Sequence, residues 1–366
     1  MAASEVTVFE PGVFQVIGGT GTACEKNGYT ARRRLWDKAF NPNALKIRKD
    51  ESVILKYALQ LEEHLQQSQG QAVNVLQWFS FLSFGIMGDF AFANSFNMLK
   101  SGKWDSGAKL VSDGMSILGP ISPVPWLAQI AFQILGAADS WQQMLDWCKE
   151  NMSGRLDLSY WFIDAQRNRE AEMNLNDIYG DAVAVVIAGS HTTASSLTFV
   201  FYELAMNLGI QRKLHDELKN LPTIFTHDSL IELPYLNAVI NESLRLHSVL
   251  PTGGNRQAGP EGVYVEGQYI PPHTTIVAPR HTISRLESCF EKANEFIPER
   301  WTEKPEMIKD IRAFQPFNLG RHSCPVTKFE IALAPGENGR GVLDDLRDTF
   351  TAQPGDLKLV FRSRTE

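Results

Sequence analysis

The pattern of hydrophobic and polar positions predicts a protein built mainly of helices. Between residues 55 and 65 leucines recur at helical spacing, which indicates an amphipathic helix. The segment from Ile178 to Leu204 is hydrophobic on nearly all sides, which is typical of a helix buried through the middle of a large protein. Helical patterns also begin at Arg32 and recur to about residue 220. Helices are therefore expected to dominate the first part of the chain.

Strand patterns are short and lie at the start of the chain and in its last third. Residues 5–17 alternate weakly and contain Pro11 and Gly12, which predicts a strand and a turn before a short helix. Residues 262–271 show a strand-like alternation, with glycines and a proline as turn signals. Residues 357–361 are a predicted short strand after a Pro-Gly turn. The predicted fold class is mainly α with small β-sheets.

Composition narrows the class of protein. The chain has 366 residues, of which 43% are hydrophobic and 21% charged, so a sizeable core can be buried. The net charge of -7 gives no reason to expect a nucleic-acid partner. The four cysteines show no paired spacing, which favours reduced thiols over a disulfide framework or a zinc site.

One cysteine ends a loop whose composition suggests chemistry. In residues 316–325 an aromatic residue, Phe317, is followed by Gly320, the cationic Arg321 and His322, and then Cys324. A thiolate needs nearby positive charge or backbone N–H groups to stay ionised. Such a thiolate suits the axial position of haem iron. The alternative is a solvated loop whose cysteine happens to follow a turn, and these ten residues alone leave both open.

Glu242 and Arg245 are three residues apart, so on a helix both side chains lie on one face. Their apolar neighbours favour partial burial, where both charges need further partners. A surface ion pair of little energetic value is the alternative.

The centre of the long apolar helix has an unusual composition. Gly189 to Thr193 combines low helix propensity with hydroxyls that compete for backbone carbonyls. A local distortion here would open a groove of the kind found at functional sites. Alternatively, the glycine serves packing and the hydroxyls bond to their own helix.

Four segments, in this order, resemble the motifs of the cytochrome P-450 monooxygenases. Their local amino-acid sequences are most similar to those of fungal members. Ala188–Thr193 resembles A-G-x-[DE]-T-T, Glu242–Arg245 matches E-x-x-R, Pro298–Trp301 matches P-E-R-[FW], and Phe317–Cys324 matches F-x-x-G-x-[RH]-x-C. The resemblance runs from about residue 5 to residue 364. It implies a cytochrome P-450-like helical fold, N-terminally truncated, in a single domain over residues 1–366.

The resemblance also assigns a cofactor and its ligands. It implies haem, with Cys324 as the thiolate ligand in the loop that carries Phe317, Gly320 and His322. Haem carboxylates are best held by arginine or another fixed donor. The resemblance places Arg256, Arg33 and His322 in that role.

Further roles follow from the same resemblance. Thr192 helps to deliver a proton to bound dioxygen, and Gly189 leaves room for it. His191 stands where the family has an acid, and histidine can shuttle protons near neutral pH. Glu242, Arg245 and Arg300 form a structural triad that supports the haem site.

Two departures from the family pattern indicate an incomplete chain. After Cys324, Val326 replaces an expected glycine, and residues 325–328 lead directly into a segment that belongs beyond the family's next helix. A similar gap lies near residues 30–31. The N-terminal membrane anchor of fungal members is also expected to be missing, and no apolar run is expected to approach the roughly 20 residues of a spanning helix.

The function that the resemblance implies is oxidation of a small apolar metabolite by O2 in fungal secondary metabolism. Electrons would come from NADPH through a separate cytochrome reductase, because the chain has no flavin or dinucleotide fingerprint. The alternative is a catalytically inactive truncated remnant or splice product that binds haem weakly or not at all.

Family members typically lie on the cytosolic face of the endoplasmic reticulum. Without the anchor, the expected location is cytoplasmic or peripheral to the membrane. The aromatic stretches 78–82 and 124–127 are candidates for membrane contact, although core packing is the favoured interpretation.

Overall fold

The computed structural model describes residues 5–18, 50–68, 70–92, 94–121, 143–144, 146–147, 149–151, 175–219, 230, 232–252, 255–319, 324, 347–348, 352–353 and 357–360. The contacts divide the chain into two compact units. Unit 1 comprises Met1–Tyr29 and Asn207–Glu330, and unit 2 comprises Thr30–Met206 and Ile331–Glu366. The helix predicted from Arg32 and the gaps predicted near residues 30–31 and 325–328 lie outside the described residues. The single domain over residues 1–366 stays a prediction.

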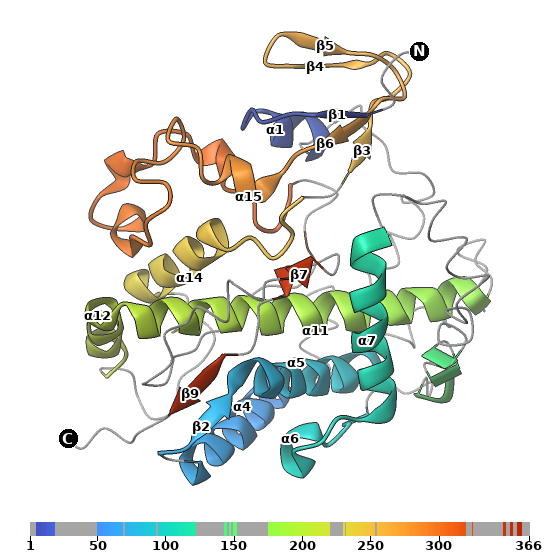
Figure 1. The fold of residues 1–366 in the computed structure, drawn as a ribbon, viewed down its shortest axis with the longest axis vertical. Coiled ribbons are helices and arrows are strands. Elements are labelled where there is room, and N and C mark those ends of the chain that lie inside the picture. Colours follow the sequence, from blue (N-terminus) through green and yellow to red (C-terminus); the bar gives the residue numbers. More distant parts are fainter. Residues whose placement is uncertain are drawn as a thin grey trace. The chain divides into compact units, whose positions relative to one another are not determined.

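Two apolar helices form the centre of unit 2. Helix α5 (Val75–Phe92) runs alongside α11 (Leu175–Met206), as Figure 1 shows. Their facing side chains are buried, and the ring centroids of Phe79 and Phe201 lie 4.8 Å apart. The apolar segment predicted as a buried helix is therefore confirmed, with its ends a few residues further out.

Three further helices accompany this pair: α4 (Asp50–Gln67), α6 (Met98–Ser101) and α7 (Ser106–Ile121). Helix α4 confirms the amphipathic helix, but its buried side differs from the predicted leucine stripe. Tyr57 and Leu61 are buried, whereas Leu55 and Leu59 are 47% and 53% exposed. The side of α4 that is buried is the side on which α5 packs, and the spacing of leucines in the sequence does not show where α5 will lie.

The short strands of unit 2 bring the end of the chain to the start of α5. Strand β2 (Ala72–Asn74) pairs antiparallel with β9 (Lys358–Val360), with Val73 opposite Leu359. Strands β7 (Arg347–Asp348) and β8 (Ala352–Gln353) form a second pair. The strand predicted near residues 357–361 is confirmed.

Unit 1 contains a three-stranded sheet in the order β1-β6-β3. Strand β1 (Glu5–Thr7) is parallel to β6 (Thr275–Val277), which is antiparallel to β3 (Arg256–Gln257). Strands β4 (Val263–Val265) and β5 (Gln268–Ile270) form a separate hairpin, as the alternating pattern predicted.

Helix α1 (Val13–Gly18) follows β1 and packs into the core of this unit. Phe14 of α1, Ile276 of β6 and Phe290 are fully buried in one hydrophobic cluster. The predicted order of strand, turn and short helix at the start of the chain is confirmed.

The remaining elements of unit 1 are helices α12 (Leu208–Leu218), α14 (Pro234–Leu246) and α15 (Arg280–Ile283), and the 3-10 helices η1 (Pro298–Trp301), η2 (Pro305–Met307) and η3 (Ile311–Ala313). Helix α14 begins at Pro234, where proline loses no helical hydrogen bond. The Glu217 carboxylate of α12 accepts from the Tyr235 and Leu236 N–H groups at 2.9 and 2.8 Å. An anion thus caps the helix start.

Two helices, Val75–Phe92 and Tyr179–Met206, are long and apolar enough to cross a membrane by length and composition. The expectation that no apolar run approaches this length is therefore wrong. Both helices are mostly buried in unit 2, as core helices of a protein interior are. Phe79 and Phe81, from the aromatic stretch 78–82, are fully buried, which supports core packing for that stretch.

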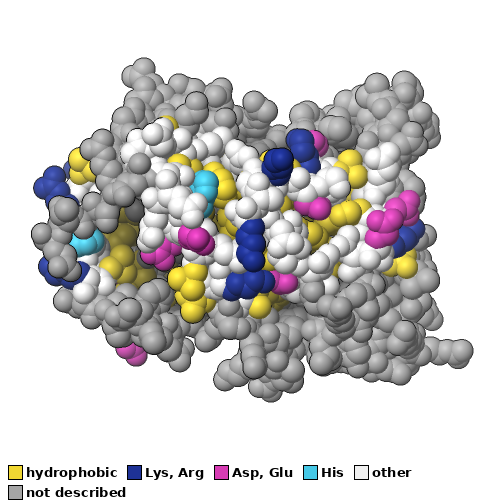
Figure 2. All heavy atoms as spheres, turned by 90° about the horizontal axis from the view of Figure 1, so that it is seen from below, with side chains coloured by type: hydrophobic (Ala, Val, Ile, Leu, Met, Phe, Trp, Pro, Cys, Tyr) yellow, Lys and Arg dark blue, Asp and Glu magenta, His cyan; other side chains and the backbone are white. Residues whose placement is uncertain are grey.

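Figure 2 shows one face of the molecule, much of it covered by residues that are not described. In its described part, acidic, basic and hydrophobic side chains are interspersed rather than gathered by type. Ion pairs of exposed side chains such as Lys109 and Asp113 each contribute little to stability.

The contact between α4 and α5 depends on a glycine. A Cβ on Gly85 would lie 2.6 Å from a ring carbon of Tyr57, and the Tyr57 hydroxyl donates to Ser95 Oγ at 2.9 Å. The ring is thus buried and held at its far end. We predict that Gly85→Ala lowers the free energy of unfolding by about 1–2 kcal/mol, because overpacking exceeds the gain in helix propensity.

Chemical denaturation of the parent, of Gly85→Ala and of the control variant Gly180→Ala in α11 measures this effect. Among the described residues, no atom lies within 4 Å of a Cβ on Gly180. That variant should be as stable as the parent or more stable by about 0.5 kcal/mol. Equal stabilities of the two variants would show that Tyr57 yields freely.

Candidate active site

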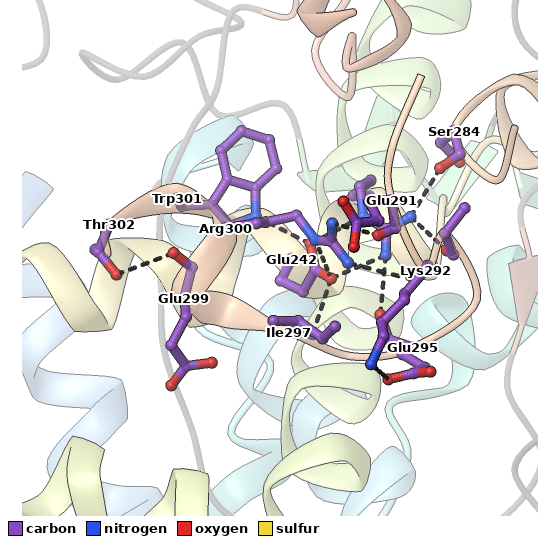
Figure 3. Close-up of polar contacts among 12 residues, drawn as sticks. Glu242, Ser284, Glu291, Lys292, Glu295, Ile297, Glu299, Arg300, Trp301 and Thr302 are labelled. Atoms are coloured by element: carbon purple, nitrogen blue, oxygen red, sulfur yellow. Dashed lines mark hydrogen bonds and ion pairs between the residues drawn. The ribbon is translucent and has the colours of Figure 1, made fainter. Parts of the chain in front are cut away.

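The carboxylate of Glu242 on α14 is fully buried and is surrounded by donors (Figure 3). Its Oε1 accepts from Arg245 Nη2 at 2.8 Å, Arg300 Nε at 2.9 Å and the Ile297 N–H at 3.0 Å. Its Oε2 accepts from Arg245 Nε at 2.8 Å and Trp301 Nε1 at 3.0 Å. The structure therefore brings together the three residues that the sequence grouped as structural support.

Backbone carbonyls occupy the remaining donors of the two buried guanidinium groups. Arg245 Nη1 donates to the carbonyls of Ser284 and Ala293 at 2.8 and 2.7 Å. Arg300 Nη1 donates to the Glu291 carbonyl at 2.9 Å. A buried ion pair is tolerated when such bonds satisfy its other groups. The network consequently holds the irregular chain between residues 284 and 301 against α14.

A second polar cluster ties η1 to α12. Glu299 Oε1 accepts from the Tyr235 hydroxyl at 2.8 Å and from Lys213 Nζ at 3.1 Å. Burial alone would raise the pKa of Glu299, but these hydrogen bonds outweigh it and hold the pKa below its ordinary value. Lys213 also lies 4.3 Å from the centre of the Tyr235 ring. The P-E-R-W segment is thus fixed on two sides.

The cysteine loop opens with a turn and closes on itself through its backbone. The Asn318 N–H donates to the Gln315 carbonyl at 3.3 Å, and Asn318 has a φ of 63°, a conformation that asparagine tolerates. The Cys324 N–H donates to the Phe317 carbonyl at 2.7 Å. Cys324 is exposed and Phe317 is 37% exposed. Gly320 and His322, predicted for the same site, lie outside the described residues.

Two buried arginines belong to the same unit as this loop. Arg256 begins β3 and is 6% exposed, and Arg280 begins α15 and is 5% exposed. Burial and the charge of Arg256 lower the pKa of Arg280 to about 10, so its guanidinium stays charged at pH 7. No carboxylate of the described residues forms an ion pair with Arg280. Arg33, the other predicted arginine, is outside the described part of the chain.

The residues predicted on α11 lie in unit 2. A Cβ on Gly189 would clash with the side chain of Met87 on α5, so this glycine permits close packing of the two helices. The Thr192 hydroxyl donates to the Ala188 carbonyl of its own helix. Helix α11 is continuous from Leu175 to Met206, so of the two alternatives left open for residues 189–193 the structure shows the second, a packing glycine and a hydroxyl bonded to its own helix. The hydroxyl satisfies a carbonyl four residues back without breaking the backbone ladder.

His191 is a buried, neutral ring. It is 6% exposed and meets Phe84 edge-on, with ring centroids 5.5 Å apart. Its Nε2 and the buried Ser190 Oγ have no hydrogen-bond partner among the described residues. Burial lowers the pKa of His191 to about 4, as expected for a histidine on an apolar helix.

The sequence motifs did not indicate contacts made by backbone groups or by residues outside the motifs. Ile297 contributes a backbone N–H to Glu242, and Arg280 lies in no motif. Trp301 belongs to the P-E-R-W motif, so the sequence could have indicated its indole N–H as a further donor to Glu242. Unit 1 thus contains an exposed thiol, that of Cys324, and the buried guanidinium group of Arg256, which are the kinds of donor that an iron porphyrin and its carboxylates require.

Comparison with known proteins identifies the family. The family model described as cytochrome P-450 matches residues 19–329. The chain belongs to the cytochrome P-450 family. Haem with a cysteine thiolate ligand is accordingly its cofactor, and it is an oxidoreductase of the monooxygenase type.

Curated fungal relatives agree with this assignment. The chain is 35% identical to cytochrome P-450 monooxygenase FCK2 of Fusarium pseudograminearum, over 93% of this chain and 67% of that protein. It is 30% identical to cytochrome P-450 monooxygenase orf5 of Eupenicillium brefeldianum, over 98% and 82% of the two chains. Tryprostatin B 6-hydroxylase of Aspergillus fumigatus is 30% identical, over 99% and 73%.

Solved structures support the fold. The haem domain of cytochrome P-450DA superposes with a TM-score of 0.74 at 17% identity, over 98% of this chain and 88% of that one. The mainly α fold with small sheets, predicted from the sequence, is confirmed as the cytochrome P-450 fold.

The buried carboxylate provides the first test of the site. We predict that Glu242→Ala lowers the free energy of unfolding by about 3–5 kcal/mol, because Arg245 and Arg300 remain buried without their anion. Haem content of the purified variant should fall with its stability. Thermal denaturation and haem quantification measure both effects.

Glu303→Ala is the matched control, because Glu303 pairs with Lys213 while its side chain is 59% exposed. Its effect should stay below about 1 kcal/mol. A soluble and haem-loaded Glu242→Ala protein, as stable as Glu303→Ala, would contradict the structural role of the network.

Burial of His191 predicts a pH dependence. Its pKa rises from about 4 in the folded chain to its ordinary value of about 6.5 in the unfolded chain. Stability present above pH 6.5 is therefore lost as pH falls toward 4, because only the unfolded chain binds the proton. Between pH 7 and 4.5 this amounts to about 2–3 kcal/mol.

Denaturant unfolding at pH 7 and 4.5 tests this for the parent, His191→Leu and His215→Gln. His191→Leu should lose about 2–3 kcal/mol less than the parent between the two pH values. His215 is exposed on α12, so its variant should follow the parent. An unchanged loss in His191→Leu would show that the ring is hydrated.

Proposed function

We propose that the protein is a haem-thiolate monooxygenase that inserts one oxygen atom from O2 into a small apolar metabolite of a fungal secondary pathway. Electrons come from NADPH through a separate cytochrome reductase. Support for the substrate class comes from the relative named as a tryprostatin B 6-hydroxylase. The proposed location is cytoplasmic or peripheral to the membrane on its cytosolic side, where a membrane-bound reductase is within reach.

The observation that carries the proposal is the backbone hydrogen bond from the Cys324 N–H to the Phe317 carbonyl. The Cys324 N–H is held at 2.7 Å from the Phe317 carbonyl, while the residue itself is exposed. The loop therefore presents the thiol outward from a closed backbone instead of burying it. Thiolates that bind metals or react occupy accessible sites near positive charge, whereas structural cysteines are buried.

Each residue predicted for the haem site has a defined task in this proposal. Cys324 binds the iron, and Arg256, with the charge of a buried guanidinium, binds a haem carboxylate. Phe317 and Gly320 shape the loop, and His322 and Arg33 supply further cations. When bound, haem supplies the activation of dioxygen. Glu242 and its arginines keep the supporting chain in place.

The residues of α11 handle protons in this proposal. The Thr192 hydroxyl donates its hydrogen to the Ala188 carbonyl. The lone pairs of its oxygen can therefore accept a hydrogen bond from water or from a ligand. His191 is placed on the proton path because it stands where the family has an acid. Its burial lowers the pKa to about 4, so the ring is neutral at pH 7 and free to accept a proton there. Gly189 leaves the helix surface without a Cβ at this point.

The proposal predicts the outcome of removing one thiol. Cys324→Ser should abolish the thiolate-type absorption band of the reduced protein with carbon monoxide, because a hydroxyl does not replace a thiolate on iron. Cys289→Ser, at a buried cysteine of the same unit, and Cys148→Ser should keep the band. The absorption spectra of the purified proteins measure this.

Two results would count against the proposal. An unchanged band in Cys324→Ser would remove the ligand assignment. A parent protein that binds no haem would favour the inactive remnant over the enzyme.

A further inference from the structure

The carbonyl of Gln315 receives two hydrogen bonds at the start of the cysteine loop. One comes from the Asn318 N–H at 3.3 Å and closes the first turn of the loop. The other comes from Arg280 Nε at 3.1 Å, thirty-five residues earlier in the chain. A charged donor makes a stronger hydrogen bond than a neutral one. The orientation of this peptide is therefore set from outside the loop.

Arg280 itself is held on several sides. It is 5% exposed and begins α15, with two residues between it and the end of β6. Its guanidinium lies 5.6 Å from the ring centre of Phe14 on α1, a side chain that is fully buried. Because the side chain is packed in the core of unit 1, it offers Gln315 a donor in a fixed position.

The turn that Arg280 holds leads directly to the cysteine. Two residues after Gln315, the Phe317 carbonyl accepts the Cys324 N–H at 2.7 Å. Leu319 packs on the hydrophobic cluster that contains Phe14. A shift of the Gln315 peptide would move the Phe317 carbonyl, and with it the backbone of Cys324.

We propose that Arg280 is a positioning residue for Cys324: it fixes the Gln315 carbonyl and thereby the direction in which the loop presents its thiolate. This inference rests on the proposed role of Cys324 as the haem ligand. It assigns to Arg280 no contact with substrate, haem or iron.

The experiment compares Arg280→Met, Arg280→Lys and Arg312→Met in the full chain at equal haem content. Reduced protein with carbon monoxide shows one absorption band for thiolate ligation and another for a protonated or displaced thiol. The ratio of the two bands should fall about tenfold in Arg280→Met, as expected for the loss of a charge-assisted hydrogen bond. Arg280→Lys keeps a charged donor and should recover most of the ratio.

Arg312→Met is the matched control, because Arg312 forms exposed ion pairs with Glu266 and Asp310 in the same unit. Its band ratio should equal that of the parent. If Arg280→Met does not fold, Arg280→Gln provides a milder neutral variant with the same expected direction. An unchanged ratio in the neutral variant that folds would overturn the proposal.

A second measurement separates positioning from carboxylate binding. Apoprotein is titrated with haemin and with haemin dimethyl ester, which lacks free carboxylates. If Arg280 positions Cys324, its replacement should weaken binding of both porphyrins to the same degree. Weakening confined to haemin, with an unchanged band ratio, would overturn positioning and make Arg280 a carboxylate ligand. Absence of the thiolate band in the parent would instead overturn the proposed function, and this inference with it.

Discussion

The buried charge of Glu242 is the constraint on which the rest of unit 1 depends. A carboxylate inside a protein is tolerated only when cations and hydrogen bonds replace the water that it has lost. Here Arg245 and Arg300 supply the cations, and Ile297 and Trp301 supply further donors. These requirements fold the irregular chain from residue 284 to residue 301 onto α14, although that chain contains little regular structure (Figure 3).

The cysteine loop uses the same kind of interaction on a smaller scale. Arg280, another buried guanidinium, donates to a backbone carbonyl at the start of the loop, and a backbone bond closes the loop at Cys324. Unit 2 is organised differently. Its centre is the apolar contact of α5 with α11, and the motif residues Gly189 and His191 are packed against α5. Both units have buried hydrophobic side chains, and in unit 1 buried polar networks also hold the irregular segments in place.

Much of the secondary structure was predictable from local patterns. The uninterrupted apolar run of α11, the alternation of the β4-β5 hairpin and the Pro-Gly pair in the sequence before β9 each carry a strong local signal. Local patterns were not sufficient where neighbouring elements decide the outcome. Leu55 and Leu59 are exposed because α5 packs along Tyr57 and Leu61. Residues 189–193 stay helical because close contact with α5 supports the helix and Thr192 bonds to its own turn.

The sequence by itself determined the family, the mainly α fold, the haem cofactor and the grouping of Glu242 with Arg245 and Arg300, because the ordered motifs record these features directly. Tertiary structure decided which backbone groups complete the site. The carbonyls of residues 284–295, the Ile297 N–H and the Gln315 carbonyl have no side-chain signature. Only folding brings them to their charged partners, and the role of Arg280 becomes visible for the same reason.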